Sequence, residues 1–402
     1  MARAWVYDRM NTKDYQDAVK RAKAKGRQPP SRWLVQYYDR TGKLRSEVAA
    51  NKTKAGNRRT ELESSLTAGT YVDPAAAKVT VGAMADKWLD ARHDLKPSTW
   101  WKYRGLLDNH VLPRWGTSPL SALEREDIAT WVTDLLKPKA EEGSGLGASQ
   151  TRHAYRVLAM VLDWCVPRRI PSNPARGVKL PIPSEAEHVY LTYDEIEALA
   201  DAAGSLKTKY DVPTASAAVN RAMILLLSYT GLRWGEAAAL RIGRVDLIKR
   251  RLRVLTTFYE VNGVQSEGLP KTGKHRTVPI PASLVPELKR VINGRTDNEL
   301  VFRTARGHSL RANNWRVREF NAAVKVAKLT DKGLTPHKLR HTAASLSIAA
   351  GADVKVIQHM LGHKDAAMTL NIYGHLFPDR LDEVADVLDI RRKAAIRKRR
   401  AA

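Results

Sequence analysis

Three segments in the C-terminal half of the sequence carry side chains suited to chemistry on phosphate. In the first, residues 230–236 (Thr-Gly-Leu-Arg-Trp-Gly-Glu), Arg233 follows a glycine and precedes a stretch rich in Ala and Leu. An arginine at the start of a helix adds its guanidinium to free backbone N–H groups and to the positive end of the helix dipole, and together these bind phosphate. The same residues also fit a plain surface ion pair between Arg233 and Glu236.

The second segment, residues 334–342 (Leu-Thr-Pro-His-Lys-Leu-Arg-His-Thr), is typical of the start of a helix. Thr335 suits the N-cap and Pro336 the first helical position, so His337 and Arg340 fall three residues apart on one face. This pairing places a proton-transfer group beside a fixed positive charge, which suits a reaction at a phosphodiester.

The third segment joins residues 360–364 (Met-Leu-Gly-His-Lys) to residues 371–375 (Asn-Ile-Tyr-Gly-His), so that Tyr373 lies ten residues after His363. A tyrosine hydroxyl is a nucleophile that can form a covalent intermediate. Taken alone, the tyrosine equally fits a position in a core or an interface.

Two other interpretations of these residues are disfavoured. His337 with His341 has the i,i+4 spacing of a zinc-binding pair, as has His359 with His363, but the first pair encloses a lysine and an arginine, which oppose a metal ion. The Gly-Leu-Pro-Lys-Thr-Gly-Lys-His stretch around Lys271 nearly spells a phosphate-binding loop, yet His stands where Ser or Thr is required and a strand, not a helix, is predicted to follow. We therefore expect neither zinc nor ATP, and we expect this lysine at a β turn.

In chain order, the candidate groups are Arg233, Lys271, His337, Arg340, His363 and Tyr373. With the motifs above and with Pro-Lys-Thr-Gly-Lys-His-Arg-Thr-Val-Pro-Ile at residues 270–280, the sequence resembles the tyrosine recombinases, the phage integrase family. The resemblance covers most of the chain. The N-terminal β-rich part is similar to arm-type DNA-binding domains, the helical part after it to core-binding domains, and the last part to catalytic domains. It implies a site-specific recombinase that uses no cofactor and no metal.

The resemblance also implies the roles of the principal groups. Tyr373 attacks the scissile phosphate to form a 3′-phosphotyrosine and a free 5′ hydroxyl, and the hydroxyl of the exchanged strand then reverses the step. Arg233 and Arg340 hold the phosphate oxygens and stabilise the transition state. Lys271 protonates the leaving oxygen, with Lys274 on the same turn as the alternative acid.

Three further groups complete the implied site. His337 accepts the tyrosine proton or holds the phosphate, His363 hydrogen-bonds the phosphate, and Glu236 orients its neighbours. For His341 and His375, which lie close to the motifs, a structural role is expected instead.

The elements that position these groups belong to a chain of 402 residues, enough for two or three domains. The excess of Lys and Arg over Asp and Glu gives a formal charge of +26, so the expected partner is a polyanion, nucleic acid before an anionic membrane. The single cysteine, Cys165, excludes an intrachain disulfide and a cysteine-rich zinc site. The N-terminal residues lack a secretory apolar core and the apolar runs are short, which predicts a cytoplasmic protein associated with a bacterial nucleoid.

The predicted fold is α+β and mainly helical, and its first part is a small β-sheet domain over residues 1–71. Trp33, Val35 and Tyr37 alternate before a turn, which predicts a hairpin, and a basic amphipathic helix follows through Leu62. The resemblance implies that this part binds the arm sites of the DNA.

The second part, residues 79–170, is a four-helix domain that the resemblance assigns to the core site. Residues 171–189 contain four prolines and predict an extended connector. Residues 190–402 form the mixed α/β catalytic domain with a C-terminal helix. The predicted helices of the second part cover residues 80–92, 98–111, 124–136 and 149–166.

Within the catalytic part, Thr192 and Glu195 predict a helix with a capping box. Asn262-Gly263 predicts a hairpin turn between two strands. A helix at 219–230 runs into Gly231, strands are expected at 252–257 and 275–280, and the chain from 311 to 400 is predicted to be helical.

Nine cations ahead of the catalytic part are expected to contact double-stranded DNA. They are Arg32, Lys43, Arg45, Lys52 and Lys54 in the first part and Lys102, Arg104, Arg152 and Arg156 in the second. The resemblance further implies a homotetramer on DNA, in which the apolar positions of residues 379–388 pack either on a neighbouring protomer or on their own chain. Whether a host DNA-bending protein and an excision factor take part stays open.

The expected function is the integration and excision of a phage or another mobile element. Three alternatives remain: a DNA-binding regulator without catalysis, a type IB topoisomerase, and a resolvase of chromosome dimers. The complete set of candidate groups argues against the first, and the N-terminal module argues against the other two.

Overall fold

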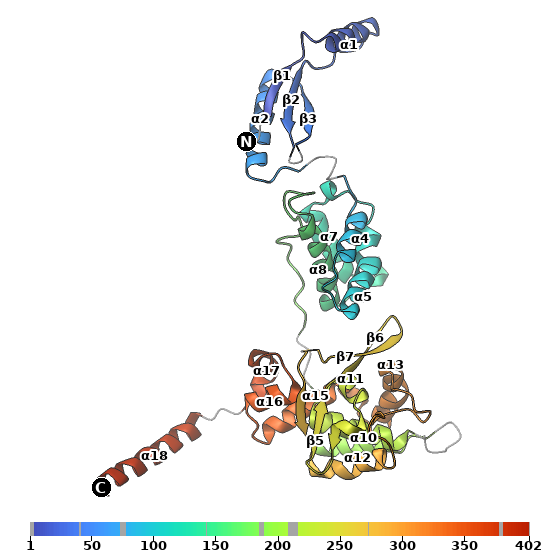
Figure 1. Cartoon of the computed structure of the whole chain (residues 1–402), viewed down its shortest axis with the longest axis vertical. Coiled ribbons are helices and arrows are strands. Elements are labelled where there is room, and N and C mark those ends of the chain that lie inside the picture. The colour runs from blue at the N-terminus through green and yellow to red at the C-terminus, as the bar shows by residue number, and fades with distance from the viewer. Residues whose placement is uncertain are drawn as a thin grey trace. The chain divides into compact units, whose positions relative to one another are not determined.

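The computed structural model describes residues 4–39, 42–72, 78–141, 143–184, 189–207, 216–271, 273–377 and 381–401. The chain forms two compact units, residues 1–185 and 186–402, and many of its elements are labelled in Figure 1. Helices dominate both units and the sheets are small, which confirms the predicted α+β, mainly helical fold class. In the described part of the chain, no helix combines the length and the apolar character needed to cross a membrane.

The first unit begins with an antiparallel sheet in the order β1-β2-β3. Its inward positions, Val35 and Tyr37, pack with Leu62 of the helix that follows, and Asn51 caps that helix by accepting a hydrogen bond from the backbone N–H of Lys54. The elements are β1 (Ala4–Asp8), α1 (Lys13–Ala24), β2 (Trp33–Tyr38), β3 (Leu44–Ala49) and α2 (Lys52–Thr67). The predicted hairpin and helix are confirmed, and β1 and α1 are additions to the prediction.

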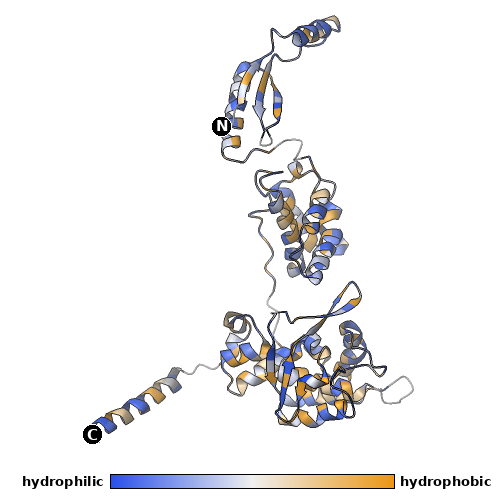
Figure 2. Ribbon diagram, in the orientation of Figure 1, coloured by the Kyte–Doolittle hydropathy of each residue, from blue (hydrophilic) through white to orange (hydrophobic). Residues whose placement is uncertain are grey.

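A helical bundle follows, close to the four predicted helices. Thr80 caps its first helix by accepting from the N–H of Ala83. The second predicted helix is interrupted by a π-helical turn at Leu107–Val111, because Pro113 lacks an N–H and its ring clashes with the carbonyl four residues earlier. The helices are α4 (Val81–Asp90), α5 (Pro97–Leu106), α6 (Leu112–Trp115), α7 (Arg125–Leu136) and α8 (Ala148–Cys165). Figure 2 shows hydrophobic residues interleaved with hydrophilic ones along them, as amphipathic helices require.

The chain after α8 lies on this bundle, where the sequence predicts an extended connector over 171–189. Ile170 and Ala175 are buried. The Tyr155 hydroxyl donates to the carbonyl of Ala175, and Arg152 donates to the carbonyl of Pro181 at 3.1 Å. Apolar residues between the prolines therefore dock the first part of this segment, and residues 185–188 lie outside the described part.

The second unit packs helices around one large core. Thr192 and Glu195 form the predicted capping box of α9. The helices are α9 (Tyr193–Gly204), α10 (Ala217–Thr230), α11 (Trp234–Ala238), α12 (Val285–Ile292), α13 (Ala312–Trp315), α14 (Asn321–Val326), α15 (Pro336–Ala349), α16 (Val354–Leu361), α17 (Ala366–Tyr373) and α18 (Leu381–Ala401). Thr335 takes the N-cap position of α15, although its side chain makes no capping hydrogen bond.

Two small sheets accompany these helices. The strands are β4 (Val245–Asp246), β5 (Arg251–Val254), β6 (Thr257–Val261), β7 (Val264–Gly268) and β8 (Arg276–Pro279), ordered β4-β5-β8 and β6-β7. Asn262 and Gly263 both have positive φ, as a two-residue hairpin turn requires, so the predicted turn is confirmed. It joins β6 to β7, which the sequence analysis did not predict, while the predicted strands at 252–257 and 275–280 correspond to β5 and β8, which pair with each other. In β8 the buried positions are Arg276 and Val278. The strand therefore places the Arg276 side chain inside the unit, where it pairs with Glu236.

Candidate active site

The six predicted groups come from five places in the second unit. Arg233 is the N-cap of α11, Lys271 lies in the turn after β7, His337 and Arg340 lie in the first turns of α15, His363 follows α16, and Tyr373 ends α17. Helices α15, α16 and α17 pack in sequence, and α15 also packs on α10, the helix that runs into Gly231. Because α15 packs against both α10 and α16, the motif that starts α15 lies close to the motifs that end α10 and α16.

Gly231 permits this close approach. Its φ is +65°, a left-handed conformation that ends α10, and a Cβ at this position would lie 2.6 Å from Cδ2 of Leu361. A side chain here would be strained by the left-handed backbone, and the end of the Leu361 side chain would have to shift to make room for it. The glycine of the Thr-Gly-Leu-Arg motif therefore suits both the backbone and the close contact with Leu361.

Arg340 is buried beneath the site, with an exposed fraction of 3%. Its two terminal nitrogens donate to the carbonyls of Gly231 at 2.5 Å and Leu361 at 2.6 Å. Burial and the nearby Arg233 lower the pKa of the Arg340 guanidinium. The main chain of two other motifs therefore holds this cation in place, and a bound anion would relieve the repulsion between the two arginines.

Among the described residues, Glu236 is the only carboxylate that forms an ion pair with Arg233 or with Arg276. Its oxygens accept from Arg276 at 3.0 and 2.6 Å and from Arg233 at 2.9 Å, while Arg276 also donates to the carbonyl of Met360 at 3.0 Å. Burial alone raises the pKa of Glu236, but the hydrogen bonds and charges of the two arginines outweigh burial and lower it. Glu236 therefore contacts Arg233 directly, as predicted, and Arg276 is a central residue that the sequence analysis did not select.

Tyr373 is almost fully buried, at 1% exposure. Its hydroxyl lies 2.8 Å from Nδ1 of His341. Burial raises the pKa of Tyr373 to about 12, against the opposing charge of Arg340. The tyrosine is thus protonated at neutral pH, and the imidazole in hydrogen-bond contact with its hydroxyl is that of His341, for which the sequence analysis expected a structural role.

His363 lies flat against the tyrosine, with ring centroids 6.4 Å apart and planes within 6°. Its Nδ1 is 2.9 Å from Oγ1 of Thr369. Burial, followed by the charges of Arg340 and other arginines, lowers the pKa of His363 to about 4. The same causes, with a contribution from Lys271, lower the pKa of His337. Both imidazoles are therefore neutral at pH 7.

Lys271 is exposed at the turn predicted for it, where the N–H of Gly273 donates to the carbonyl of Pro270 at 2.8 Å. The next residue, Thr272, lies outside the described part. Lys274 is also exposed and lines a pocket beside His363. His375 lies 3.3 Å from the hydroxyl of Tyr190 through Nε2, a contact between the end of α17 and the segment before α9.

The predicted DNA-contacting cations of the first unit divide into two groups. Arg32 pairs with Asp8 at 2.8 Å, Arg45 with Asp39 at 2.9 Å, and Arg104 with Asp86 and Asp108, while Arg152 donates to Pro181. Lys43, Lys52, Lys54, Lys102 and Arg156 are exposed.

Lys102 and Arg156 line one hollow between α5 and α8 with His153. Burial and these two cations lower the pKa of His153. Asp163 also lines this hollow and pairs with Arg176 at 3.0 Å, so Lys102 and Arg156 leave the hollow with a net positive charge, whereas ion pairs hold Arg32, Arg45 and Arg104.

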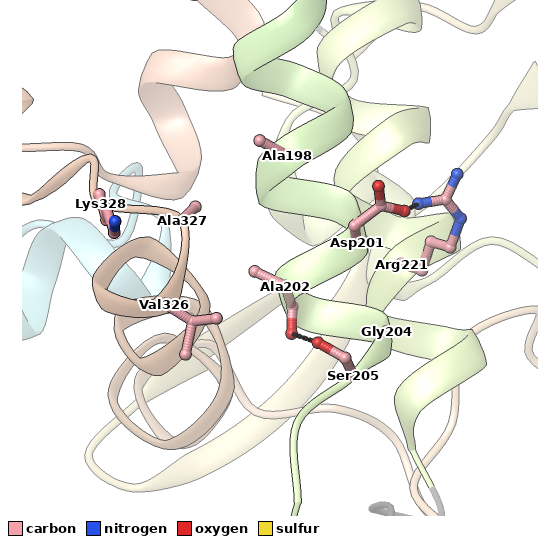
Figure 3. Close-up of a pocket in the computed structure, with 9 residues that line it drawn as sticks. All are labelled: Ala198, Asp201, Ala202, Gly204, Ser205, Arg221, Val326, Ala327 and Lys328. Atoms are coloured by element: carbon pink, nitrogen blue, oxygen red, sulfur yellow. Dashed lines mark hydrogen bonds and ion pairs between the residues drawn. The ribbon is translucent and has the colours of Figure 1, made fainter.

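A different hollow of about 560 Å³ lies between α9, α10 and the end of α14 (Figure 3). Several of its polar groups are already engaged: Arg221 pairs with Asp201 and with Glu287, and the Ser205 hydroxyl donates to the carbonyl of Ala202 at 3.1 Å. The described side chains here serve the packing of the unit, and we assign them no chemistry.

Comparisons with known proteins agree with this geometry. Residues 189–380 match the phage integrase family and residues 80–136 match the phage integrase N-terminal SAM-like domain. A tyrosine recombinase XerC-like protein of Caldanaerobacter subterraneus subsp. tengcongensis is 27% identical over 382 residues, which cover 87% of this chain and 93% of the relative. Tyrosine recombinase XerD of Mycobacterium tuberculosis (strain H37Rv) is 34% identical over 204 residues, 48% of this chain and 59% of the relative.

Solved structures share the fold. The Tn1549 transposon integrase in complex with transposon right end DNA has a TM-score of 0.63 at 22% identity, covering 79% of this chain and all of that chain. A lambda integrase dimer bound to a core site has a TM-score of 0.51 at 19% identity, covering 84% and 91%. With the family matches on both units, the named relatives and the motifs gathered at one site, the chain belongs to the phage integrase family and is a tyrosine-type site-specific recombinase.

Proposed function

We propose that this recombinase is an integrase that inserts and excises a phage or another mobile element. It acts on double-stranded DNA through a 3′-phosphotyrosine on Tyr373. The observation that carries the proposal is the contact between the Tyr373 hydroxyl and His341 in a site that also holds the guanidinium groups of Arg233 and Arg340. A nucleophile, a proton acceptor and fixed positive charge are what phosphoryl transfer without a cofactor requires.

The proposed cleavage step forms one bond to phosphorus and breaks one. The oxygen of Tyr373 bonds to phosphorus, its proton passes to Nδ1 of His341, and the bond from phosphorus to the 5′ oxygen breaks. Lys271 gives a proton to that oxygen, leaving a free 5′ hydroxyl. Arg233 and Arg340 stabilise the charge on the non-bridging oxygens in the transition state.

The neutral imidazoles complete the proposed site. His337 and His363 can hydrogen-bond a phosphate oxygen without adding charge. Rejoining is the same step in reverse, with the 5′ hydroxyl of the exchanged strand as the nucleophile. We assign the tyrosine proton to His341 in place of His337 because, among the described residues, only His341 lies within hydrogen-bond distance of the hydroxyl.

Both parts of the first unit are proposed to bind DNA. The helical bundle would contact the core site through the hollow of Lys102, His153 and Arg156, and the N-terminal sheet with α2 would bind arm sites. The DNA complexes of the Tn1549 and lambda integrases, which share the fold, support a DNA-binding assignment.

Resolution of chromosome dimers is the second candidate, since relatives are named tyrosine recombinase XerC-like and XerD. The N-terminal module favours integration. Residues 4–72 contain a sheet with its own core of Val35, Tyr37 and Leu62, and this module lies ahead of both family matches. A separate domain of this kind fits an enzyme that holds additional DNA sites.

The nucleophile is tested by a denaturing-gel assay for a covalent protein–DNA adduct. The substrates are nicked duplexes from both sides of the chain's own gene, and the variants are Tyr373→Phe and, as a matched control, Tyr193→Phe at an exposed tyrosine. We expect adduct with the wild type and the control variant and none with Tyr373→Phe. Adduct that persists in Tyr373→Phe refutes the assignment.

The integrase assignment is tested by recombination between two marked duplexes. We expect strand exchange between the element junction and a host site, and loss of that exchange when residues 1–72 are removed, while adduct on a core site alone persists. Relaxation of supercoils without exchange supports a topoisomerase. Exchange that needs only a chromosomal core site and tolerates the deletion supports a resolvase.

A tetramer on two DNA sites is part of the proposal. In α18, Val387, Leu388 and Ile390 are exposed apolar residues, and the side chains of Leu381 and Val384 lie outside the described ones. We assign the described apolar residues to packing on a neighbouring protomer. The triple change to Ala should leave single-site binding intact and reduce the mass of the two-site complex in sedimentation; an unchanged mass overturns the assignment.

A further inference from the structure

A pocket of about 250 Å³ adjoins the active site on the side of His363. Its walls are the segment before β8, the outer side of α16 and the turn that follows α16. His363, whose ring lies against Tyr373, and Arg276, which holds Glu236, belong to both the pocket and the site. The imidazole of His363 is therefore shared by the pocket and the active site.

Three lysines line this pocket and none of its lining residues is acidic. Lys274 comes from the segment before β8, Lys355 from α16 and Lys364 from the turn after it, and all three are exposed. None of the three forms an ion pair with a described residue, and Lys355 donates to the neutral amide of Gln358 at 3.1 Å.

The arginine of this pocket has a carboxylate partner, and its lysines have none within the described part of the chain. Arg276 is matched by Glu236, so the positive charge in excess here comes from lysines that belong to three different segments. Ammonium groups that converge on one hollow without a carboxylate favour an anion. A tetrahedral phosphate group is small enough for this pocket of about 250 Å³ and carries the charge that the three lysines favour.

We propose that this pocket binds a backbone phosphate of the cleaved DNA strand, next to the scissile phosphate. The inference rests on the proposed function, because a strand whose scissile phosphate lies on Arg233 and Arg340 must place a neighbouring phosphate within one nucleotide of Tyr373. Lys274 and Lys364 then hold the strand in register, and Lys274 is a positioning residue, which leaves the proton transfer to Lys271.

The experiment pairs protein variants with phosphates neutralised one at a time as methylphosphonates on either side of the scissile position. The variants are Lys274→Ala with Lys364→Ala, and Lys325→Ala on α14 as a control that removes an exposed lysine elsewhere. We expect one methylphosphonate position to weaken wild-type binding by about tenfold and to have no further effect on the double variant. The control variant should retain the full loss.

Two readouts separate this proposal from alternatives. Replacing both lysines should reduce the dependence of log Kd on log salt concentration by about one phosphate contact, roughly 0.9 in slope. A substrate with sulfur in place of the leaving 5′ oxygen needs no acid, so it should rescue Lys271→Ala and leave Lys274→Ala unchanged.

The outcomes are distinct. The pocket assignment is overturned if the double variant and the methylphosphonate each weaken binding independently at every position, or if the sulfur substrate rescues Lys274→Ala. In either case, wild-type adduct on unmodified DNA still supports the proposed function. Absence of wild-type adduct on every duplex counts against the proposed function itself.

Discussion

Replacing Glu236 by glutamine tests the charge balance of the site. The carboxylate is fully buried and faces Arg276, whose side chain is 4% exposed, and Arg233. Glutamine keeps the shape, but it removes the negative charge and turns an N–H₂ group toward guanidinium donors. Removing one partner of a buried ion pair costs about 3–5 kcal/mol, because the other partner stays buried without its counter-charge.

That free energy predicts a measurable change in thermal unfolding. For a unit of this size, 1 kcal/mol corresponds to about 2–4 °C in Tm, so the transition of residues 186–402 should fall by about 6–20 °C. The assay is calorimetry of the full chain, in which the transition of this unit is identified by its response to the variant. Glu197→Gln is the matched control: its side chain is 48% exposed and pairs with Arg221 at 3.1 Å, which limits its contribution to about 1 kcal/mol or less.

The result that refutes this reasoning is a decrease for Glu236→Gln no larger than that for Glu197→Gln. The buried carboxylate would then contribute no more than an exposed one. The Glu236→Gln variant is expected to unfold at the lower temperature and, below that temperature, to bind DNA but form less adduct. This combination would show that Glu236 holds Arg233 in position for the reaction.

Three further predictions concern protons and charge. Burial raises the pKa of Tyr373 to about 12, so without His341 the hydroxyl must lose its proton to solvent. The rate of adduct formation by His341→Ala should therefore be low at neutral pH and rise about tenfold per pH unit up to pH 10, with a weaker pH dependence in the wild type. A rate for the variant that does not change with pH in rapid-quench assays contradicts the role of His341. Arg156→Gln should lower the salt-dependence slope of DNA binding by about 0.9, whereas Arg104→Gln, whose native guanidinium is held by two aspartates, should leave it unchanged in titrations at several salt concentrations. The arginines hold the pKa of Glu236 below its ordinary value of 4.5, so the ionised carboxylate stabilises the folded unit fully above pH 4.5 and loses this effect as the pH falls through the folded pKa. The difference in free energy of unfolding between wild type and Glu236→Gln, measured in urea, should therefore decrease from pH 7 towards pH 3. A difference that stays constant with pH contradicts this assignment.

Local sequence signals predicted the elements that position the site. The capping box at Thr192, the left-handed Gly231 and the Asn262-Gly263 turn each depend on a few adjacent residues, and each is present. β1 was not predicted because its pairing with β2 joins segments separated by a long insertion containing α1, so no periodicity within a short window reports it. The same limit applies to the docking of Ala175 on the helical bundle, which is a tertiary contact.

The candidate site was predicted in its motifs and incompletely in its contacts. Alternation in β8 places Arg276 on the buried side together with Val278, a signal that could have identified this arginine as a core cation in need of a carboxylate. For the histidines, spacing alone could not decide between His337 and His341, which lie one turn apart on α15 with ring centroids 5.0 Å apart. Only the position of α17 shows which imidazole meets the tyrosine.

The near-complete burial of Tyr373 has a kinetic consequence. A phenol that is 1% exposed cannot reach a phosphate until the residues around it move. The observed cleavage rate is then the rate of the chemical step multiplied by the fraction of molecules in which the hydroxyl is uncovered. A partner that stabilises the uncovered form would accelerate cleavage without touching a reacting atom. Cleavage then requires a protein–DNA complex that lasts until the hydroxyl is uncovered, so long-lived complexes are cleaved in preference to brief encounters.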